Sequence, residues 1–225
     1  MNGEFFSKKE ASISVFDRGF LFSDSVYEVT AVLDGNLVDW KEHFARLIRS
    51  LSHLNLENNF QEEDFYRIQK KLINENRLKE GLCYVQVTRG VAERDFNFAK
   101  KSLLPTVVIF TQEKQILNNA ASKVGIKIIT VPDDRWRRRD IKTTQLLAQS
   151  LAKTHAVQEG VDDSLLVQSG FINEGSSSNV FIFKDERIIT PSLSNDILGG
   201  ITRFSVIKFC HINNIEIKER KINID

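Results

Sequence analysis

The sequence predicts a mixed α/β (α+β) protein with two domains. Apolar residues change several times between the alternating spacing of strands and the three-to-four spacing of helices, so both element types are expected. A polar stretch of weak periodicity at residues 112–122 separates two regions that each contain strands and helices. We therefore expect an N-terminal domain at residues 1–114 and a C-terminal domain at residues 115–225.

The first region is expected to contain a sheet and two helices. Residues 11–16 alternate apolar and polar side chains, which is typical of a strand. Residues 26–33 are rich in β-branched and aromatic side chains, and the Asp34-Gly35 pair after them indicates a hairpin because glycine tolerates positive φ. Apolar spacing predicts the remaining elements, which are helices around residues 44–51 and 65–73 and strands at 84–88 and 106–111.

The second region is expected to combine strands, hairpins and helices. It begins with a strand at residues 123–131, and Pro132 marks its end. The predicted elements that follow are a helix at 144–159, hairpins at 163–174 and 179–190, a helix at 201–213 and a final strand at 215–222.

Composition excludes several classes of function. Lysine and arginine together number 31 and aspartate and glutamate 30, so no global basic field is available to hold nucleic acid or an anionic membrane. No run of about 18 apolar residues suggests a membrane span. Cys83 and Cys210 match no metal-binding spacing and the histidines form no zinc motif, so we expect no metal. A reducing, cytoplasmic compartment is the expected location.

Four short segments carry polar groups where chemistry is expected. Lys142 lies on a polar segment between a strand and a helix, where a desolvated amine would be a Schiff-base nucleophile. The hydroxyls of residues 176–178 and the glycines before the helix at 201 would bind an oxyanion or phosphate. Arg89 and Arg94 follow a strand, where an arginine would clamp a carboxylate. Taken singly, each segment has a plainer interpretation, as a surface lysine, a polar turn, a glycine turn or a surface arginine.

The order of these segments is more informative than any one of them. Along the chain the sequence reads D-R-G-F-L-F-S-D-S-V-Y-E-V, E-H-F-A-R-L, Q-V-T-R-G, D-I-K-T, N-E-G-S-S-S-N-V and L-G-G-I-T-R. This ordered set covers nearly the whole chain and closely resembles the class IV aminotransferases, the fold-type IV enzymes that use pyridoxal 5′-phosphate. Three of the segments, V-Y-E-V, Q-V-T-R-G and E-G-S-S-S-N-V, are most similar to the branch of that family that acts on D-amino acids.

The resemblance implies a fold, an assembly and a role for each matching residue. It implies a small N-terminal sheet-and-helix domain, a C-terminal domain with a barrel-like sheet, a cofactor in the cleft between them and a homodimer. Lys142 would carry the cofactor as a Schiff base and move the proton between the substrate α-carbon and C4′ of the cofactor. Glu174 would pair with the pyridine nitrogen and keep the ring protonated as an electron acceptor. The other implied contacts are Arg46, Ser177, Ile201 and Thr202 for the cofactor and Tyr27 and Arg94 for the substrate.

The implied reaction is ping-pong transamination between an amino acid, with D-alanine as the expected example, and a 2-oxo acid. Branched-chain L-amino acid transamination and aminodeoxychorismate lyase activity are the alternatives within the family. Two departures are visible. The carboxylate trap of the D-specific enzymes is written R-x-H and here reads Arg94-Asp95-Phe96, and the sequence ends at K-I-N-I-D, before a helix and a strand that family members normally add. A truncated, inactive remnant of the fold is the alternative from another class.

Overall fold

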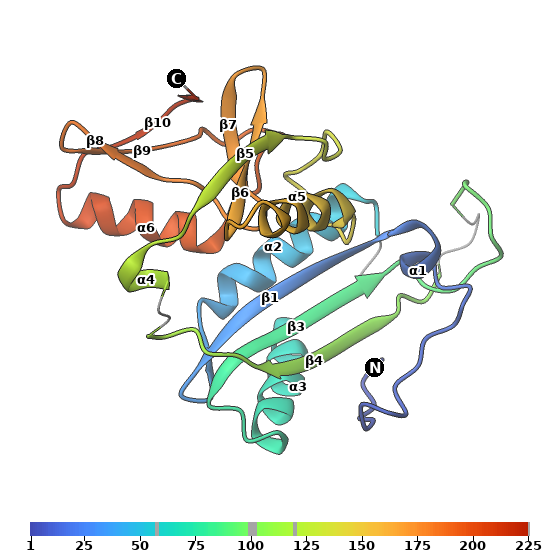
Figure 1. Cartoon of the computed structure of the whole chain (residues 1–225). Helices are drawn as coiled ribbons and strands as arrows, with labels where there is room; N and C mark the ends of the chain where they lie inside the picture. Colours follow the sequence, from blue (N-terminus) through green and yellow to red (C-terminus); the bar gives the residue numbers. More distant parts are fainter. Residues whose placement is uncertain (57–58, 99–102, 119–120, 225) are drawn as a thin grey trace. The chain divides into compact units, whose positions relative to one another are not determined.

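The chain forms two compact units, each with sheets and helices (Figure 1). This computed structural model describes residues 1–56, 59–98, 103–118 and 121–224. Unit 1 comprises Met1–Asn119 with Lys142–Thr144, and unit 2 comprises Ala120–Ile141 with Gln145–Asp225. The mixed α/β class is confirmed. The sequence placed Lys142 with residues 115–225, whereas its contacts group it with unit 1; part of the expected linker, residues 119–120, lies outside the described residues.

Unit 1 is built on an antiparallel sheet with strand order β2-β1-β3-β4. Its strands are β1 (Ser25–Leu33), β2 (Asn36–Leu37), β3 (Glu80–Thr88) and β4 (Val107–Glu113). The predicted hairpin is confirmed, since Asp34 and Gly35 adopt φ values of 49° and 72° between β1 and β2. Residues of β1 alternate between buried and half-buried, so one face of the strand lies in the core.

Two long helices cover that face (Figure 1). The helices of unit 1 are α1 (Arg18–Phe22), α2 (Trp40–His53) and α3 (Glu62–Glu75), and the last two confirm the helices predicted from apolar spacing. Val26 and Val32 of β1 are completely buried, as are Leu47 and Leu51 of α2 to within one per cent. Burial of each such side chain contributes about 1.5–3 kcal/mol, so this interface positions α2 firmly against β1.

The strand predicted at residues 11–16 is wrong. These residues are exposed and do not form a strand. The backbone turns instead, because the N–H of Asp17 donates to the carbonyl of Ser14 and the N–H of Phe16 donates to Oγ of Ser14. Alternation predicts a strand only where a neighbouring strand edge is available to pair with it, and none of the described residues pairs with this segment as a strand.

Unit 2 contains two sheets and two long helices. Its strands are β5 (Ile128–Pro132), β6 (Asp163–Gln168), β7 (Phe171–Gly175), β8 (Ile182–Lys184), β9 (Arg187–Thr190), β10 (Ile217–Glu219) and β11 (Ile222–Asn223). Its helices are α4 (Ala121–Val124), α5 (Leu147–Gln158) and α6 (Ile201–Ile212). The strand expected at 123–131 is shorter than predicted, because residues 121–124 form α4.

The sheets of unit 2 have strand orders β11-β7-β6-β5 and β10-β9-β8, and no closed barrel forms among the residues described. The predicted hairpins are present as β6–β7 and β8–β9. The end of the chain passes from one sheet to the other, since β10 pairs with β9 and β11 pairs with β7. The barrel-like character that the resemblance implied is therefore limited to this shared final segment.

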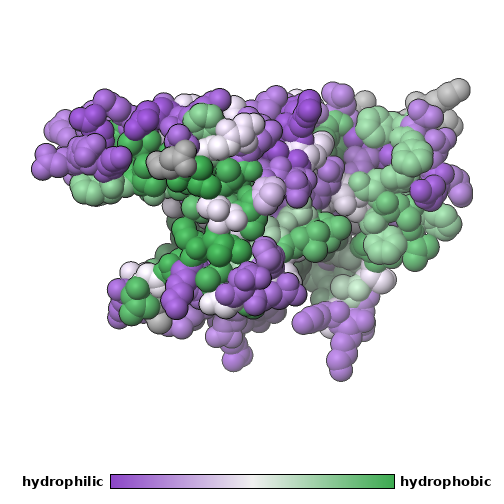
Figure 2. Space-filling model, turned by 45° about the horizontal axis from the view of Figure 1, so that its top comes forward, coloured by the Kyte–Doolittle hydropathy of each residue, from purple (hydrophilic) through white to green (hydrophobic). Residues whose placement is uncertain are grey.

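Both cysteines are buried and unpaired, as small hydrophobic residues in the core. Within the described part of the chain, no helix has the length and apolar character that crossing a membrane requires. Figure 2 shows hydrophobic side chains grouped into continuous areas on the face in view.

Candidate active site

Lys142 lies beside the first residues of β1, within unit 1. Its carbonyl accepts a hydrogen bond of 3.0 Å from the N–H of Tyr27, and Thr143 forms an isolated bridge with Val26. The hydroxyls of Thr144 and Ser25 are 2.5 Å apart. These contacts extend the sheet by one short segment and hold the Lys142 backbone against β1, leaving its half-buried side chain beside the sheet.

The amine of Lys142 lies over an aromatic ring. Its Nζ is 4.2 Å from the ring centroid of Tyr27, a cation–π distance. Tyr27 stacks on Tyr84 at 5.6 Å, and Tyr84 stacks on Phe110 at 4.7 Å, so one face of the sheet carries a row of rings. Burial, and then the neighbouring Tyr27, raise the pKa of Tyr84 to about 12, which keeps that phenol neutral. The structure thus brings together the side chains of Lys142 and Tyr27, two of the predicted site residues.

Arg46 lies on the other face of β1, where α2 packs. Its Nε and Nη2 donate to the two carboxylate oxygens of Glu28 at 2.8 and 2.7 Å, and Nδ1 of His43 lies 2.7 Å from the same carboxylate. The Glu28 side chain is 2% exposed. Burial raises the pKa of Glu28, but the hydrogen bonds from Arg46 and His43 outweigh it and lower the pKa below its ordinary value.

Sequence reasoning singled out Arg46 and missed Glu28 and His43. A signal for Glu28 was present, since it occupies a position between Val26 and Thr30 on the buried face of an alternating strand. A charged residue at such a position is almost always paired. The pair makes Arg46 a fixed guanidinium rather than a mobile one.

Two arginines after β3 were candidates for a carboxylate clamp, and they differ. Arg89 is buried and grips Asp24 through Nε and Nη2 at 2.7 and 3.0 Å, while it also donates to the carbonyls of Leu54 and Asn55. Arg89 is therefore a structural residue that joins the end of α2 to the start of β1. Arg94 is exposed, and its guanidinium lies 5.4 Å from the ring centroid of Phe22. Arg94 alone of the two is open to a ligand.

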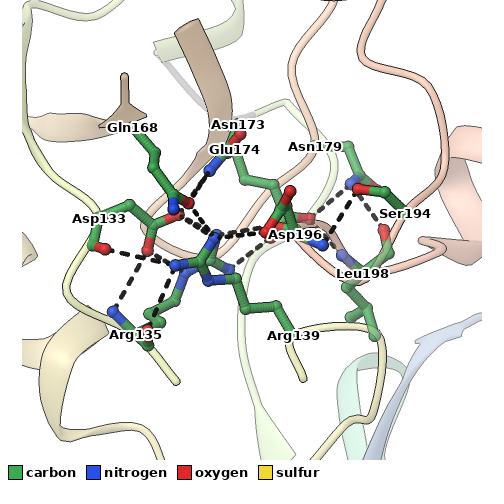
Figure 3. A network of polar contacts seen from close by, with 10 residues as sticks. All are labelled: Asp133, Arg135, Arg139, Gln168, Asn173, Glu174, Asn179, Ser194, Asp196 and Leu198. Atoms are coloured by element: carbon green, nitrogen blue, oxygen red, sulfur yellow. Dashed lines mark hydrogen bonds and ion pairs between the residues drawn. The ribbon is translucent and has the colours of Figure 1, made fainter. Parts of the chain in front are cut away.

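Glu174 lies at the centre of a polar network in unit 2 (Figure 3). It belongs to β7 and is 4% exposed. Its Oε1 accepts hydrogen bonds of 2.8 Å from Nδ2 of Asn179 and from the N–H of Leu198, and its Oε2 accepts one from Nη1 of Arg135. Burial raises the pKa of Glu174, and the opposing influence of Arg135 and Leu198 does not outweigh it.

The hydroxyl-rich turn after β7 is divided between structure and surface. Ser176 is buried and its Oγ donates to Oδ1 of Asp163, while Ser177 is exposed. The N–H of Gly175 donates to the carbonyl of Ser178 at 2.7 Å, which closes the turn. The predicted contact Ser177 is therefore exposed to solvent, as is the neighbouring Ser178.

The start of α6 carries the other predicted phosphate contacts. Gly200 is the N-cap and no side chain caps the helix. The first backbone N–H groups of a helix have no partner within it and favour anions. Ile201 is buried and Thr202 exposed, so Thr202 presents a hydroxyl beside those N–H groups.

Gly200 has a packing reason that the sequence did not reveal. A Cβ at this position would lie 2.0 Å from Oδ1 of Asn179, the residue whose Nδ2 holds Glu174. At Gly199 a Cβ would meet nothing closer than 3.4 Å, at the ring of Phe204.

We expect Gly200→Ala to displace Asn179 and to cost about 1–3 kcal/mol of unfolding free energy through overpacking. Urea unfolding would measure the loss, and Gly199→Ala is the matched control, with an expected loss below about 1 kcal/mol. Equal losses for the two variants would show that the Asn179 contact does not decide the effect.

A cavity of about 680 Å³ in unit 1 lies elsewhere. It is lined by residues of the N-terminal segment, α3 and β4, including Phe5, Phe65 and Phe110, and none of the predicted site residues lines it. Its volume lies in the range of ligand pockets, but the residues that we assign to the predicted chemistry lie elsewhere in the chain.

Comparisons with known proteins identify the family. The model of the amino-transferase class IV family matches residues 25–225. A D-alanine aminotransferase of Staphylococcus aureus is 37% identical over 225 residues, which is 100% of this chain and 79% of the relative. A D-alanine aminotransferase of Bacillus licheniformis is 34% identical and is covered over 78% of its length.

Solved structures agree on the fold. The branched-chain amino acid aminotransferase of Escherichia coli is 21% identical, with a TM-score of 0.91 over 99% of this chain and 77% of that one. The T.th. branched-chain amino acid aminotransferase in complex with N-(5′-phosphopyridoxyl)-L-glutamate is 25% identical, with a TM-score of 0.87 over 100% of this chain and 76% of that one. The chain therefore belongs to the class IV aminotransferases, as the order of its motifs predicted.

Proposed function

We propose that this chain transfers the amino group of D-alanine, or of a similar small D-amino acid, to a 2-oxo acid, with pyridoxal phosphate as cofactor. Its family is that of the aminotransferases, so amino acids and 2-oxo acids are its substrates. The observation that carries the D-specific proposal is the 37% identity, over the whole chain, to a D-alanine aminotransferase. The branched-chain enzymes among the solved structures are less similar, at 21–25% identity.

Each unit carries polar groups of the kinds that pyridoxal phosphate needs. Unit 1 supplies a half-buried amine, Lys142, and a fixed guanidinium, Arg46. Unit 2 supplies the buried carboxylate of Glu174 and the exposed hydroxyls of Ser177 and Thr202. These are the groups that an aldehyde, a ring nitrogen and a phosphate require.

Each residue then has a distinct task. When bound, the cofactor supplies a ring that accepts the electron pair left on the substrate α-carbon. Lys142 would hold the cofactor through its amine, and the same amine would take the α-proton of the substrate. The carboxylate of Glu174 would accept a hydrogen bond from the ring N–H and so keep the ring protonated. Arg46 binds the phosphate, with help from Ile201 N–H, Thr202 and Ser177. Tyr27 and Arg94 bind the substrate carboxylate.

The positive charge of Arg46 is already balanced by Glu28, and this pairing affects how Arg46 would bind a phosphate. Both oxygens of Glu28 are bonded to Arg46, so the pair carries no net charge and the arginine is held in one orientation. Such a pair binds a phosphate by directed N–H groups more than by net attraction. Nδ1 of His43 contacts the same carboxylate.

We also propose a cytoplasmic homodimer. On helix α5, Leu147, Leu151 and Val157 are 73%, 62% and 62% exposed to solvent. A second subunit packed on this helix would bury these apolar side chains. Both cysteines are unpaired, which fits a reducing compartment.

The cofactor's absorbance band tests the function. Purified protein with added pyridoxal phosphate is expected to show the band, D-alanine is expected to bleach it with release of pyruvate, and L-alanine serves as the enantiomeric control. Bleaching by L-leucine alone would favour branched-chain L-amino acid transamination. A band that no amino acid bleaches, or no band at all, would contradict the proposal.

A further inference from the structure

Arg135 contacts two carboxylates, and it donates more hydrogen bonds to one of them than to the other. Its Nε and Nη2 donate to the two oxygens of Asp133 at 2.9 and 2.8 Å, which is a bidentate pairing. A single nitrogen, Nη1, reaches Oε2 of Glu174. All three side chains are at most 7% exposed, so water screens these charges little.

Asp133 is itself anchored on several sides (Figure 3). Nδ2 of Asn173 donates to its Oδ2 at 3.0 Å, and Nη1 of Arg139 lies 3.4 Å from that oxygen. The N–H of Asp133 donates to the carbonyl of Val167 on β6. Asp133 is therefore a fixed anion, and it fixes the plane of the Arg135 guanidinium.

The pKa values of the two carboxylates that Arg135 contacts are shifted in opposite directions. Burial raises the pKa of Asp133, but hydrogen bonds from Arg135 and Asn173 outweigh it and lower the pKa. Burial also raises the pKa of Glu174, where Arg135 does not outweigh it and the charge of Asp133 raises it further. The same guanidinium thus neutralises one acid fully and the other in part.

Glu28 in unit 1 is a buried glutamate whose charge is fully neutralised, and it serves as a comparison for Glu174. Arg46 donates to both of its oxygens, His43 adds a third contact, and its pKa is lowered. Glu174 is buried to a similar degree but receives one guanidinium nitrogen instead of two. The two glutamates therefore differ in how many guanidinium nitrogens donate to each carboxylate.

We propose that Asp133 is a positioning residue, which draws the guanidinium of Arg135 away from Glu174 and so leaves Glu174 able to hold the proton of the cofactor's ring nitrogen. The inference rests on the proposed function, because it gives Glu174 that partner. Among the residues that the structure describes, the charged groups near Glu174 are Arg135 and Asp133, and beyond them Arg139 and Asp196, which pair at 3.1 Å. Asn179 and Leu198 complete its surroundings with neutral donors.

The arrangement has a chemical use. A carboxylate gripped by the whole fork would be a weak base and would hold a ring proton loosely. A buried carboxylate with no cation would be protonated itself. One guanidinium nitrogen places Glu174 between these limits, and Asn179 and Leu198 fix its orientation, so that it meets a pyridine N–H without reorganisation.

Two substitutions that are expected to shift the pKa of Glu174 in opposite directions test the proposal in cofactor-free protein. Asp133→Asn is expected to lower the pKa of Glu174 by about one unit, a tenfold weaker hold on a proton, because Arg135 is then offset by Glu174 alone. Arg135→Gln is expected to raise that pKa by a similar amount. The measurement is the carboxyl ¹³C shift of Glu174 against pH, assigned with Glu174→Gln. Arg138→Gln is the control, since Arg138 is partly exposed and pairs with Asp140.

If Asp133 had only a structural role, Asp133→Asn and Arg135→Gln would shift the pKa of Glu174 in the same direction. That result would overturn the proposal, and so would an unchanged pKa of Glu174 in both variants. If one variant does not fold, the sign in the other decides. In protein loaded with ¹⁵N-labelled pyridoxal phosphate, Asp133→Asn is expected to move the ring-nitrogen signal toward the unprotonated position. A shift in the cofactor-free protein without this change would overturn the assigned use of Glu174. Failure of the wild-type protein to bind the cofactor would contradict the proposed function, and this inference with it.

Discussion

Replacing Lys142 by alanine is expected to lower the rate of amino-group transfer by at least about 10²- to 10⁴-fold, the contribution typical of a positioned acid–base group. The loss is expected because the variant lacks the amine that we propose to hold the cofactor and to take the α-proton, while the backbone contacts to β1 stay. Those contacts use the carbonyl of Lys142 and the residues after it, so the variant is expected to fold. Activity with D-alanine and the cofactor's absorbance band are the two measurements.

A second readout separates chemistry from binding. Reduction with borohydride followed by peptide mapping is expected to find the cofactor attached at Lys142 in wild-type protein and nowhere in the variant. Lys41→Ala is a suitable control, because Lys41 is exposed on α2. Attachment at another lysine, or an unchanged band in Lys142→Ala, would contradict the assignment.

Replacing Arg46 by methionine is expected to destabilise the protein by about 3–5 kcal/mol at neutral pH, because it leaves the buried charge of Glu28 without its cation. The substitution also removes the proposed contact to the cofactor phosphate, so the affinity for pyridoxal phosphate is expected to fall. Urea unfolding of cofactor-free protein isolates the first effect, and titration with the cofactor measures the second. Arg49→Met, one turn along the same helix and exposed, is the matched control.

The loss in Arg46→Met should depend on pH in a defined direction. In the wild-type protein the pKa of Glu28 is lowered, so its contribution to stability is present above the ordinary glutamate pKa and is lost as pH falls through the lowered value. In the variant, burial without the guanidinium raises that pKa, so protonation relieves the penalty as pH falls. The difference between the two proteins is therefore expected to shrink from about pH 7.5 to about pH 5. A double variant with Glu28→Gln should recover part of the loss; a difference that grows in acid would contradict this account.

Several elements could be predicted from the sequence because their signals are local. The Asp34-Gly35 turn, α2 and α3 were predicted because backbone preference and apolar spacing act within a few residues. The strand predicted at 11–16 failed for the complementary reason, since a strand needs a partner that local alternation does not supply. Lys142 became a candidate by its place in an ordered series of motifs. Its grouping with unit 1 was not foreseen, because it depends on contacts to residues distant in sequence, such as the hydrogen bond from Tyr27.

By itself the sequence determined the family, the mixed α/β class and the candidate residues, because motif order and spacing are properties of the chain alone. The tertiary structure decided which charges are paired. Glu28 and Arg46 lie 18 positions apart, and Arg135 and Glu174 lie 39 apart. Buried charges must find partners, but the choice among many arginines and acids depends on which strands and helices come together. For this reason the tuning of Glu174 by Asp133 and Arg135 became visible only in the folded molecule.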